Sequence, residues 1–220
     1  MRGAVHRFWH HEEAAQIYPS LLFRSHCIAR ATVPLLQSAV DRLKTFPEGD
    51  PIVPGLLSFL QSFIPEELGH DEWLLEDLEV LGVSRQEVLA QVPPPTVASM
   101  VGAQSYWIAH HHPVSLLGYC FATETAPPPV EAVKDLIRRT GLPQKAFRSF
   151  LRHAVIDLKH GAYVERVVDQ LPLTSDHLSM IGVSLTHTLH SLAQSTEEVM
   201  HLHEVRKSSA SPDDEKIRLC

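Results

Sequence analysis

The stretch "FRSFLRHAVIDLKHGAYVERV", residues 147–167, repeats its apolar residues at helical spacing and carries charged groups on two separate faces. Its basic residues share one face, within about 40° of one another at about 100° per residue: Arg148, Arg152, Lys159 and Arg166. His153, Asp157 and His160 cluster within about 60° on another arc, more than about 100° away. Because the basic face marks the side toward water, these three groups are expected to point into the protein.

The same helical periodicity runs through most of the chain, and almost no segment alternates at the two-residue period of a strand. Clusters of proline and glycine separate the periodic segments. We expect helices over residues of about 6–18, 21–45, 53–82, 85–91, 96–110, 113–125, 129–140, 144–169 and 174–205. Ser84 and Thr174 are typical N-caps, the first within a capping box. The sequence therefore predicts an all-α fold.

The length of 220 residues suits one domain with a sizeable core. The last segment, "RKSSASPDDEKIRLC", is polar and lacks periodicity, as flexible segments do. We expect a single helical-bundle domain over residues 1–205 and a flexible C-terminal tail over residues 206–220.

The composition excludes several classes of partner. The net charge of −7 offers no basic surface for nucleic acid or for an anionic membrane. No stretch approaches the roughly 18 uninterrupted apolar residues of a membrane span, and the N-terminus lacks the apolar region of a secretory signal. Cys27, Cys120 and Cys220 are too few and too scattered for a disulfide framework or a thiolate zinc site. We therefore expect a cytoplasmic protein without nucleic-acid or membrane partners.

Two further segments place carboxylates on apolar helical faces. Glu67 and His70 stand three residues apart, on a stripe that also carries the apolar residues Phe63, Leu74 and Leu78. Glu124 is the sole charged residue of an apolar helical segment. Because an isolated buried carboxylate costs several kcal/mol, each of these groups needs a partner or a cation.

The three helices together supply three carboxylates and three histidines: Glu67, His70, Glu124, His153, Asp157 and His160. Six such ligands suit two metal ions, and the lack of cysteine ligands favours iron or manganese in a redox role, with zinc as an alternative on affinity. Paired carboxylates can bridge two ions about 3.5–4 Å apart. The alternative is a metal-free polar core held by hydrogen bonds between histidine and aspartate.

The order of these motifs carries a family resemblance. Glu-x-x-His, a lone Glu on an apolar helix, and His-x-x-x-Asp-x-x-His resemble the heme-oxygenase-like diiron oxidases, often called iron-containing redox enzymes. The resemblance covers residues of about 20–205. It implies a bundle of about seven core helices, with the fold that heme oxygenase and the thiamine-salvage hydrolases share, and a homodimeric assembly.

The resemblance also implies a cofactor and an activity. The six named residues would hold two iron ions (Fe²⁺/Fe³⁺), with manganese as the alternative metal and O2 as co-substrate. Some members space the first Glu differently, which leaves Glu66 as a rival to Glu67. The implied activity is that of an oxidoreductase that oxidises a small organic substrate: an amino acid, an amine or a fatty-acid-like molecule.

Several roles stay open at this point. Tyr119, Tyr163 and Trp107 are candidates for supporting the ligands or lining a cavity. The residues that bind substrate are unknown, and the sequence does not show whether an external electron donor takes part.

Two alternatives follow from the same fold superfamily. In a heme-binding or heme-degrading protein, His10 or His11 on the first helix would hold the heme. The segment "GYCFATE", residues 118–124, has one glycine where heme oxygenases have a glycine-rich helix, and its glutamate suits iron ions better than a porphyrin. A thiamine-salvage-type hydrolase would use Cys120 as its nucleophile, but the sequence places no base for it.

Overall fold

Helices make up the regular structure of the residues that the computed structural model describes, 2–125 and 128–209, and no strand occurs among them. The α-helices are α1 (Arg2–Trp9), α2 (Ala14–Leu43), α3 (Val53–Glu67), α4 (His70–Val80), α5 (Arg85–Ala90), α6 (Pro95–His110), α7 (Leu116–Glu124), α8 (Val130–Thr140), α9 (Arg148–Gln170) and α10 (Ser175–Ser209). Two 3-10 segments, η1 (Pro113–Ser115) and η2 (Gln144–Phe147), lead into α7 and α9. In these ranges no helix combines the length and the apolar character needed to cross a bilayer. The predicted all-α class is confirmed.

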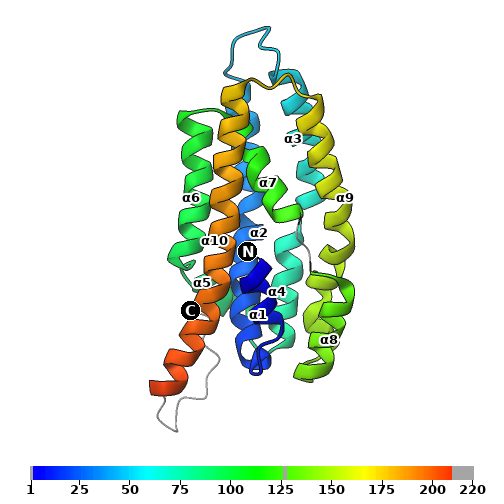
Figure 1. Ribbon diagram of the computed structural model, residues 1–220, viewed down its shortest axis with the longest axis vertical. Coiled ribbons are helices and arrows are strands. Elements are labelled where there is room, and N and C mark those ends of the chain that lie inside the picture. Colours follow the sequence, from blue (N-terminus) through cyan, green and yellow to red (C-terminus); the bar gives the residue numbers. More distant parts are fainter. Residues whose placement is uncertain (1, 126–127, 210–220) are drawn as a thin grey trace.

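The long helices run side by side along the longest axis of the molecule (Figure 1). α2 contacts α3, α4 and α6, and α10 contacts α1, α6 and α7. In Figure 1, α3 and α4 follow each other along nearly one line, and α9 contacts both of them as well as α7 and α8. The junction of α3 and α4, the end of α7 and the middle of α9 therefore lie together within the bundle.

Two apolar clusters fill the bundle, one toward each end. The first joins the second half of α2 to α3, α6, α7 and the second half of α9, with Phe59 and Phe63 among its buried side chains. The second joins α1 and the first half of α2 to α4 and α8, around Tyr18 and Phe147, whose ring centroids lie 4.2 Å apart. Each buried aromatic side chain stabilises the fold by about 1.5–3 kcal/mol. The junction of α3 and α4 lies between the two clusters.

Most predicted helix limits agree with the structure to within a few residues. Ser84 forms the predicted capping box at the start of α5, and Thr174 accepts the backbone N–H of His177 at the start of α10. α10 continues to Ser209, so the first residues of the predicted tail are helical. Residues 210–220, the rest of that tail, lie outside the described residues, and the division into domain and tail stays a prediction.

The predicted break between the helices over residues 6–18 and 21–45, next to Pro19, is wrong. α2 runs without interruption through Pro19 and Pro34, and the break before it falls at residues 10–13. A proline inside a helix costs about 3 kcal/mol, largely through a lost backbone hydrogen bond. Tyr18 is fully buried beside Pro19, and its hydroxyl donates to Ala146 O at 2.9 Å. Tertiary packing of this kind outweighs the cost of the proline.

The predicted single helix over residues 53–82 is also wrong. The chain leaves the helix at Leu68 and Gly69, and Gly69 has a φ of +90°, a left-handed conformation that strains other residues. Pro65 lies inside α3 and neither begins nor ends it. The apolar spacing continues through this break, so periodicity alone does not reveal it.

Candidate metal centre

Three of the six predicted ligands lie at helix ends. Glu67 is the last residue of α3, His70 is the first of α4, and Glu124 is the last of α7. The turn at Gly69 places His70 Nδ1 3.3 Å from Glu67 Oε2. The sequence pattern put these two residues on one continuous helix, whereas their contact depends on a break between two helices.

The other three predicted ligands follow one another along α9. Asp157 and His160 are buried and His153 is partly buried, as expected for the inward face of this helix. Gly161 allows α9 to approach the end of α7, because a Cβ at this position would lie 3.2 Å from Glu124 O. This close approach brings His160 next to the side chain of Glu124.

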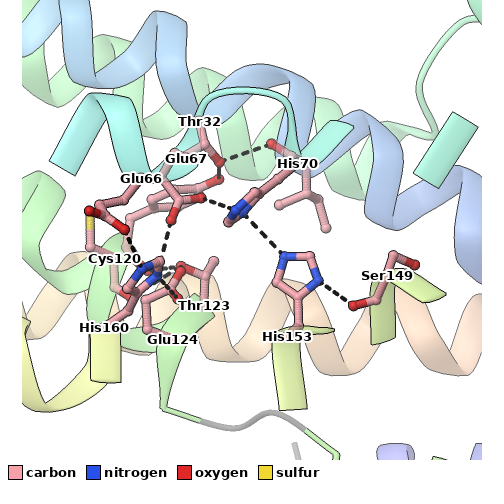
Figure 2. A network of polar contacts seen from close by, with 12 residues as sticks. Thr32, Glu66, Glu67, His70, Cys120, Thr123, Glu124, Ser149, His153 and His160 are labelled. Atoms are coloured by element: carbon pink, nitrogen blue, oxygen red, sulfur yellow. Dashed lines mark hydrogen bonds and ion pairs between the residues drawn. The ribbon is translucent and has the colours of Figure 1, made fainter. Parts of the chain in front are cut away.

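Glu67, Glu124 and His160, which we call the inner group, each place one ligand atom within 4.8 Å of the others (Figure 2). His160 Nδ1 lies 3.2 Å from Glu67 Oε1 and 3.2 Å from Glu124 Oε2. The Thr123 hydroxyl donates to the other oxygen of Glu124 at 3.1 Å. The contact with Glu124 is a hydrogen bond, whereas Glu67 Oε1 is buried and has no hydrogen-bond partner among the described residues.

His70, His153 and Asp157, which we call the outer group, lie beside the inner group; Figure 2 shows the two histidines. His153 Nε2 faces His70 Nδ1 at 3.3 Å, and His153 Nδ1 donates to Ser149 O at 2.8 Å. That hydrogen bond holds the ring proton on Nδ1 and leaves a lone pair on Nε2. Asp157 Oδ1 is buried and has no hydrogen-bond partner among the described residues. The outer group thus offers ligand atoms that the protein itself does not use.

The inner group is internally ion-paired. Burial opposes the ionisation of Glu67, yet the imidazoles of His160 and His70 outweigh burial and lower its pKa to about 2. Burial and the charge of Glu67 raise the pKa of Glu124, although the hydrogen bond from His160 opposes the shift. The hydrogen bond to Glu124 and the close contact with the Glu67 carboxylate raise the pKa of His160 to about 10. His160 therefore carries a positive charge next to the two carboxylates.

Asp157 forms no hydrogen bond or ion pair with His160 among the described residues, and the charge of His160 lowers its pKa only in part. Burial, followed by the charges of Glu124 and Glu67, raises its pKa to about 8. Burial and the neighbouring His70 lower the pKa of His153, which favours the neutral ring that binds metals. Glu67 and Glu124 also stand at the C-terminal, negative ends of their helices. The geometry concentrates negative potential at a point where a cation would be strongly stabilised.

A buried carboxylate behind the outer group was not singled out by the sequence pattern. Asp77 of α4 is fully buried and accepts hydrogen bonds from the backbone N–H of Ser149, at 2.8 Å, and from its hydroxyl. Because Ser149 O also holds His153, Asp77 ties α4 to the helical turn that orients this ring. Asp77 follows His70 by about two helical turns, on the same apolar stripe as Leu74. A lone carboxylate on that stripe is the sequence signal that could have identified Asp77.

A cavity of about 240 Å³ lies against the two groups. Its wall includes five of the predicted ligands: Glu67, His70, Glu124, His153 and Asp157. The remaining wall comes mainly from α1, α2, α7, α9 and α10, with Phe8, Trp9 and Phe150 as its aromatic members. The candidate ligands therefore face a space that admits a small molecule.

Of the three aromatic residues expected to support the ligands, Tyr119 lies nearest to that role. It is fully buried, and its hydroxyl lies 2.9 Å from Oγ1 of Thr32, which lines the cavity. Tyr163 is hydrogen-bonded to a serine of α3, and the Trp107 ring packs 5.6 Å from that of His187. Neither Tyr163 nor Trp107 is among the residues that line the cavity.

Glu66, the rival to Glu67, faces another side of the same histidine. Its side chain is 65% exposed, and its Oε2 lies 3.7 Å from His160 Nε2, whereas the inner group gathers around Nδ1. Glu67 and not Glu66 is therefore the carboxylate that belongs to the inner group.

The residues of the two alternative functions lie outside the cavity wall. Cys120 is buried, and burial raises the pKa of its thiol well above the usual range, so the reactive thiolate is disfavoured. His10 is exposed and His11 is partly exposed, and neither lines the cavity.

The residues present fit metal ions better than a purely hydrogen-bonded core. Carboxylate and imidazole ligands without thiolates are a donor set that iron and manganese accept. Buried polar atoms are normally hydrogen-bonded, yet Asp157 Oδ1 has no partner, and no hydrogen bond joins it to His153 or His160 among the described residues. The expected histidine–aspartate hydrogen bonds of a metal-free core do not form.

The sequence comparison agrees with this donor set. The model of one protein family, described as iron-containing redox enzyme, matches residues 30–189. The chain belongs to this family. All six candidate ligands of this iron-containing redox enzyme fall within the matched range, and the resemblance expected from the motif order is confirmed. No curated protein has a sequence that matches the chain.

Two solved structures share the fold. A domain of unknown function with a heme oxygenase-like fold, from Shewanella denitrificans OS217, superposes with a TM-score of 0.77 at 19% identity, over 94% of this chain and 88% of that one. A TenA homolog from Pseudomonas syringae pv. tomato str. DC3000 superposes with a TM-score of 0.64 at 10% identity, over 88% of this chain and 84% of that one. The chain therefore has the heme-oxygenase-like fold that the sequence predicted.

Proposed function

We propose that this iron-containing redox enzyme is a nonheme diiron oxidase or oxygenase that uses O2 to oxidise a small organic substrate. The observation that carries the proposal is the convergence of the inner and outer groups on one side of a cavity, where Asp157 presents a buried oxygen without a partner. The redox family to which the chain belongs supports the choice of iron. Manganese is the alternative metal for the same ligands.

The two groups divide the ligands between two ions. Glu67, Glu124 and His160 would hold one ion, and His70, His153 and Asp157 would hold the other. Glu67 faces His160 with Oε1 and His70 with Oε2, so it is the carboxylate that stands between the two sets. Iron bound by these residues would supply the binding and reduction of dioxygen.

The protein's own groups prepare the site for this chemistry. Ser149 O accepts the Nδ1 proton of His153, which keeps Nε2 available as a ligand atom. His160 Nδ1 has to give up its proton before it can bind a metal ion. Apolar side chains of the cavity wall, such as Phe8 and Leu192, exclude water from the substrate.

Iron content tests the proposal directly. The protein is loaded with Fe(II) without oxygen, desalted, assayed for iron and then exposed to air while the visible spectrum is followed. We expect about two iron ions per chain and a visible absorption that develops on oxygenation. Glu165→Gln is the control variant and should retain the same amount of iron, because Glu165 is an exposed carboxylate on α9 outside both groups. No iron retained above the level of a metal-free carrier protein would overturn the proposal.

The same samples separate the alternatives. A heme protein would show a Soret band after incubation with hemin, which we do not expect because His10 and His11 lie outside the cavity wall. A metal-free core would keep its stability in the presence of a chelator. Three further expectations stay predictions: a homodimer, an external electron donor and a cytoplasmic location. Size-exclusion chromatography with light scattering tests the homodimer.

A further inference from the structure

Trp73 of α4 lies against both histidines of the outer group. The centroid of its indole ring is 4.3 Å from that of the His70 ring and 5.8 Å from that of the His153 ring. Among the described residues, no other tryptophan or tyrosine ring packs against a histidine of the candidate centre. Trp73 is therefore the oxidisable aromatic side chain that has direct ring contact with the candidate ligands.

The ring contacts continue from His70 to the rest of the centre. The centroid of the His70 ring lies 4.9 Å from that of His153 and 6.4 Å from that of His160, and the His160 ring is inclined to the His70 ring by only 13°. The rate of electron transfer in proteins falls steeply with the gap between the groups, so rings in contact form an efficient path. Trp73 is thus coupled to both the outer and the inner group through His70.

Trp73 is not part of the cavity wall. It is partly exposed and does not line the cavity, so a substrate in the cavity does not cover it. The guanidinium carbon of Arg152 lies over the indole ring, 4.6 Å from its centroid. Arg152 is exposed and forms no ion pair among the described residues. An uncompensated positive charge therefore lies at the indole ring.

Trp73 is a better electron donor than the buried Tyr119. Indole and phenol rings are among the side chains that give up a single electron most easily, but a tyrosine has to lose its hydroxyl proton when it is oxidised. Burial raises the pKa of Tyr119 above its usual range, and its hydroxyl lies 2.9 Å from the Thr32 hydroxyl, which is not a base. An indole can first form a cation radical and then release its N–H proton to water. The environment therefore favours Trp73 as the donor.

Oxygen chemistry at the proposed centre creates a need for such a donor. Two Fe(II) ions supply only half of the electrons that reduce one O2 molecule to water. When a substrate is bound, it supplies the remaining electrons as it is oxidised. When the cavity holds no oxidisable substrate, the oxidised centre withdraws electrons from the protein, and the ligand histidines themselves are exposed to damage.

We propose that Trp73 gives one electron to the oxidised centre, through the ring of His70, when no oxidisable substrate occupies the cavity. This inference rests on the proposed diiron function, because the centre that has reacted with O2 is the oxidant. The indole becomes a cation radical and releases the proton of Nε1 to water. A one-electron reductant from solution, such as ascorbate, restores the indole with one electron, and water returns the proton. Without a reductant, the indole radical combines with O2 and the side chain gains oxygen.

Arg152 controls how easily Trp73 is oxidised. A guanidinium group over an indole ring is attracted by the negative face of the neutral ring. When the ring loses an electron and becomes positive, this attraction turns into repulsion. Arg152 therefore stabilises the reduced indole and limits the consumption of Trp73.

Electron paramagnetic resonance and peptide mass spectrometry test the proposal. Protein loaded with Fe(II) without oxygen is mixed with oxygenated buffer in the absence of substrate, and samples are frozen at successive times, digested and assayed for iron. We expect an organic radical whose hyperfine structure changes when the protein contains indole-deuterated tryptophan. Oxygen should be incorporated at Trp73 and not at Trp107, a partly exposed tryptophan whose ring packs 5.6 Å from that of His187. Ascorbate should suppress the modification, and Zn(II)-loaded protein should show neither signal.

A pair of tryptophan variants separates electron transfer from packing. Trp73→Phe keeps an aromatic ring against His70, so iron should be retained while the radical and the oxygenated residue are lost. Trp107→Phe is the matched control and should keep the iron, the radical and the modification of Trp73.

A pair of arginine variants tests the role of the positive charge. Arg152→Gln should increase the yield of oxygenated Trp73 by about two- to fivefold, the factor that corresponds to a cation–π contact at an exposed site. Arg166→Gln is its control, because Arg166 lies over the Tyr163 ring on the same helix, 5.7 Å from the centroid, and should leave the yield unchanged.

The outcomes separate this inference from the proposed function. A radical that does not respond to deuterated tryptophan, or oxygen found equally at Trp73 and Trp107, would overturn the inference while retained iron still supports the diiron centre. A lower yield in Arg152→Gln would contradict the role of Arg152. If Trp73→Phe retains less iron, the deuterated protein still decides whether a tryptophan is oxidised. Protein that retains no iron would reject the diiron centre and this inference together.

Discussion

The inner and outer groups of the candidate site differ in whether an imidazole forms an ion pair with their buried carboxylates. In the inner group, one nitrogen of His160 lies 3.2 Å from an oxygen of Glu67 and 3.2 Å from an oxygen of Glu124. In the outer group, the His153 ring is hydrogen-bonded to Ser149 O, and Asp157 forms no ion pair with a histidine among the described residues. Each group keeps one buried carboxylate oxygen without a hydrogen-bond partner, Glu67 Oε1 and Asp157 Oδ1. The two groups lie side by side, and both contain carboxylates and imidazoles, so the kinds of side chain alone do not explain the difference.

Because of this difference, a metal ion would have a different effect at the inner group than at the outer group. At the inner group an ion has to displace the proton that His160 shares with two carboxylates, so binding there is coupled to proton release. At the outer group an ion would pair with Asp157, which has a buried oxygen without a partner and forms no ion pair with a histidine among the described residues. The inner group can contribute to the stability of the metal-free protein, whereas the outer group gains its main stabilisation from the ion.

The largest effect is expected when the inner group loses its imidazole. His160→Ala leaves Glu67 and Glu124 buried without their shared positive charge, and breaking a buried ion pair in this way costs about 3–5 kcal/mol. Urea unfolding of the metal-free protein measures the loss. His153→Ala is the matched control from the outer group, for which a loss of about 1 kcal/mol is expected. Equal losses for both variants would erase the distinction between the groups.

The pH dependence of the metal-free protein should show the same contrast. The pKa of His160 is raised to about 10, so the folded protein keeps a proton that the unfolded chain releases near 6.5. Its contribution to stability is complete below pH 6.5 and is lost as the pH rises toward 10. The slope is up to about 1.4 kcal/mol per pH unit. Unfolding curves across this range measure it, and His160→Gln should flatten them.

Asp157 adds a slope over a lower range. Its pKa is raised from 3.8 to about 8, so the folded protein again binds the extra proton and stability falls as the pH rises through this interval. Asp157→Asn should remove that part of the slope and leave the part due to His160. A stability that rises with pH between 6.5 and 8 would contradict both assignments.

A smaller effect on stability, with a large effect on iron, is expected for Asp157→Asn at neutral pH. Because Asp157 holds a proton when its pKa is about 8, the amide should change the free energy of unfolding of the metal-free protein by less than about 1 kcal/mol. Iron content should fall from about two to about one ion per chain. Iron assay and urea unfolding of the same sample test this. A destabilisation as large as that of His160→Ala would place Asp157 in a structural hydrogen-bond network instead.

The smallest effect is expected for Glu66→Gln. Its side chain is exposed and lies 3.7 Å from the outward nitrogen of His160, and an exposed pair of this kind contributes about 0–1 kcal/mol. Iron content should stay within about twofold of the unchanged protein, whereas Glu67→Gln should lose iron from both groups. If the two variants exchange these outcomes, Glu66 is the ligand and the inner group is wrongly composed.

Local spacing was sufficient to predict the helical class and the buried face of α9. The positions of His153, Asp157 and His160 on that face follow from 3.6 residues per turn, and the structure places all three toward the interior. Glu124 was identified for the same reason, as a lone charge on an apolar helix that ends buried beside His160.

Contacts between distant segments could not be predicted in this way. The break at Gly69 interrupts an apolar pattern that continues on both sides, so the relation of Glu67 to His70 was derived from the wrong local geometry. The bond between Asp77 and Ser149 joins residues far apart in the chain, and no local pattern encodes it. The rings of Phe8 and Trp9 reach the cavity because α1 packs across the bundle against α10.

The sequence by itself determined the all-α class, the inward face of α9 and the residue types available to a metal centre. Only the tertiary structure decided that Glu67 and not Glu66 belongs to the inner group, that Asp157 keeps an unpaired oxygen, and that the adjoining cavity lacks an arginine or lysine among the described residues. The physical reason is the range of the interactions. Helical periodicity arises from contacts three or four residues apart, whereas distances between side chains of different helices depend on how the whole bundle packs.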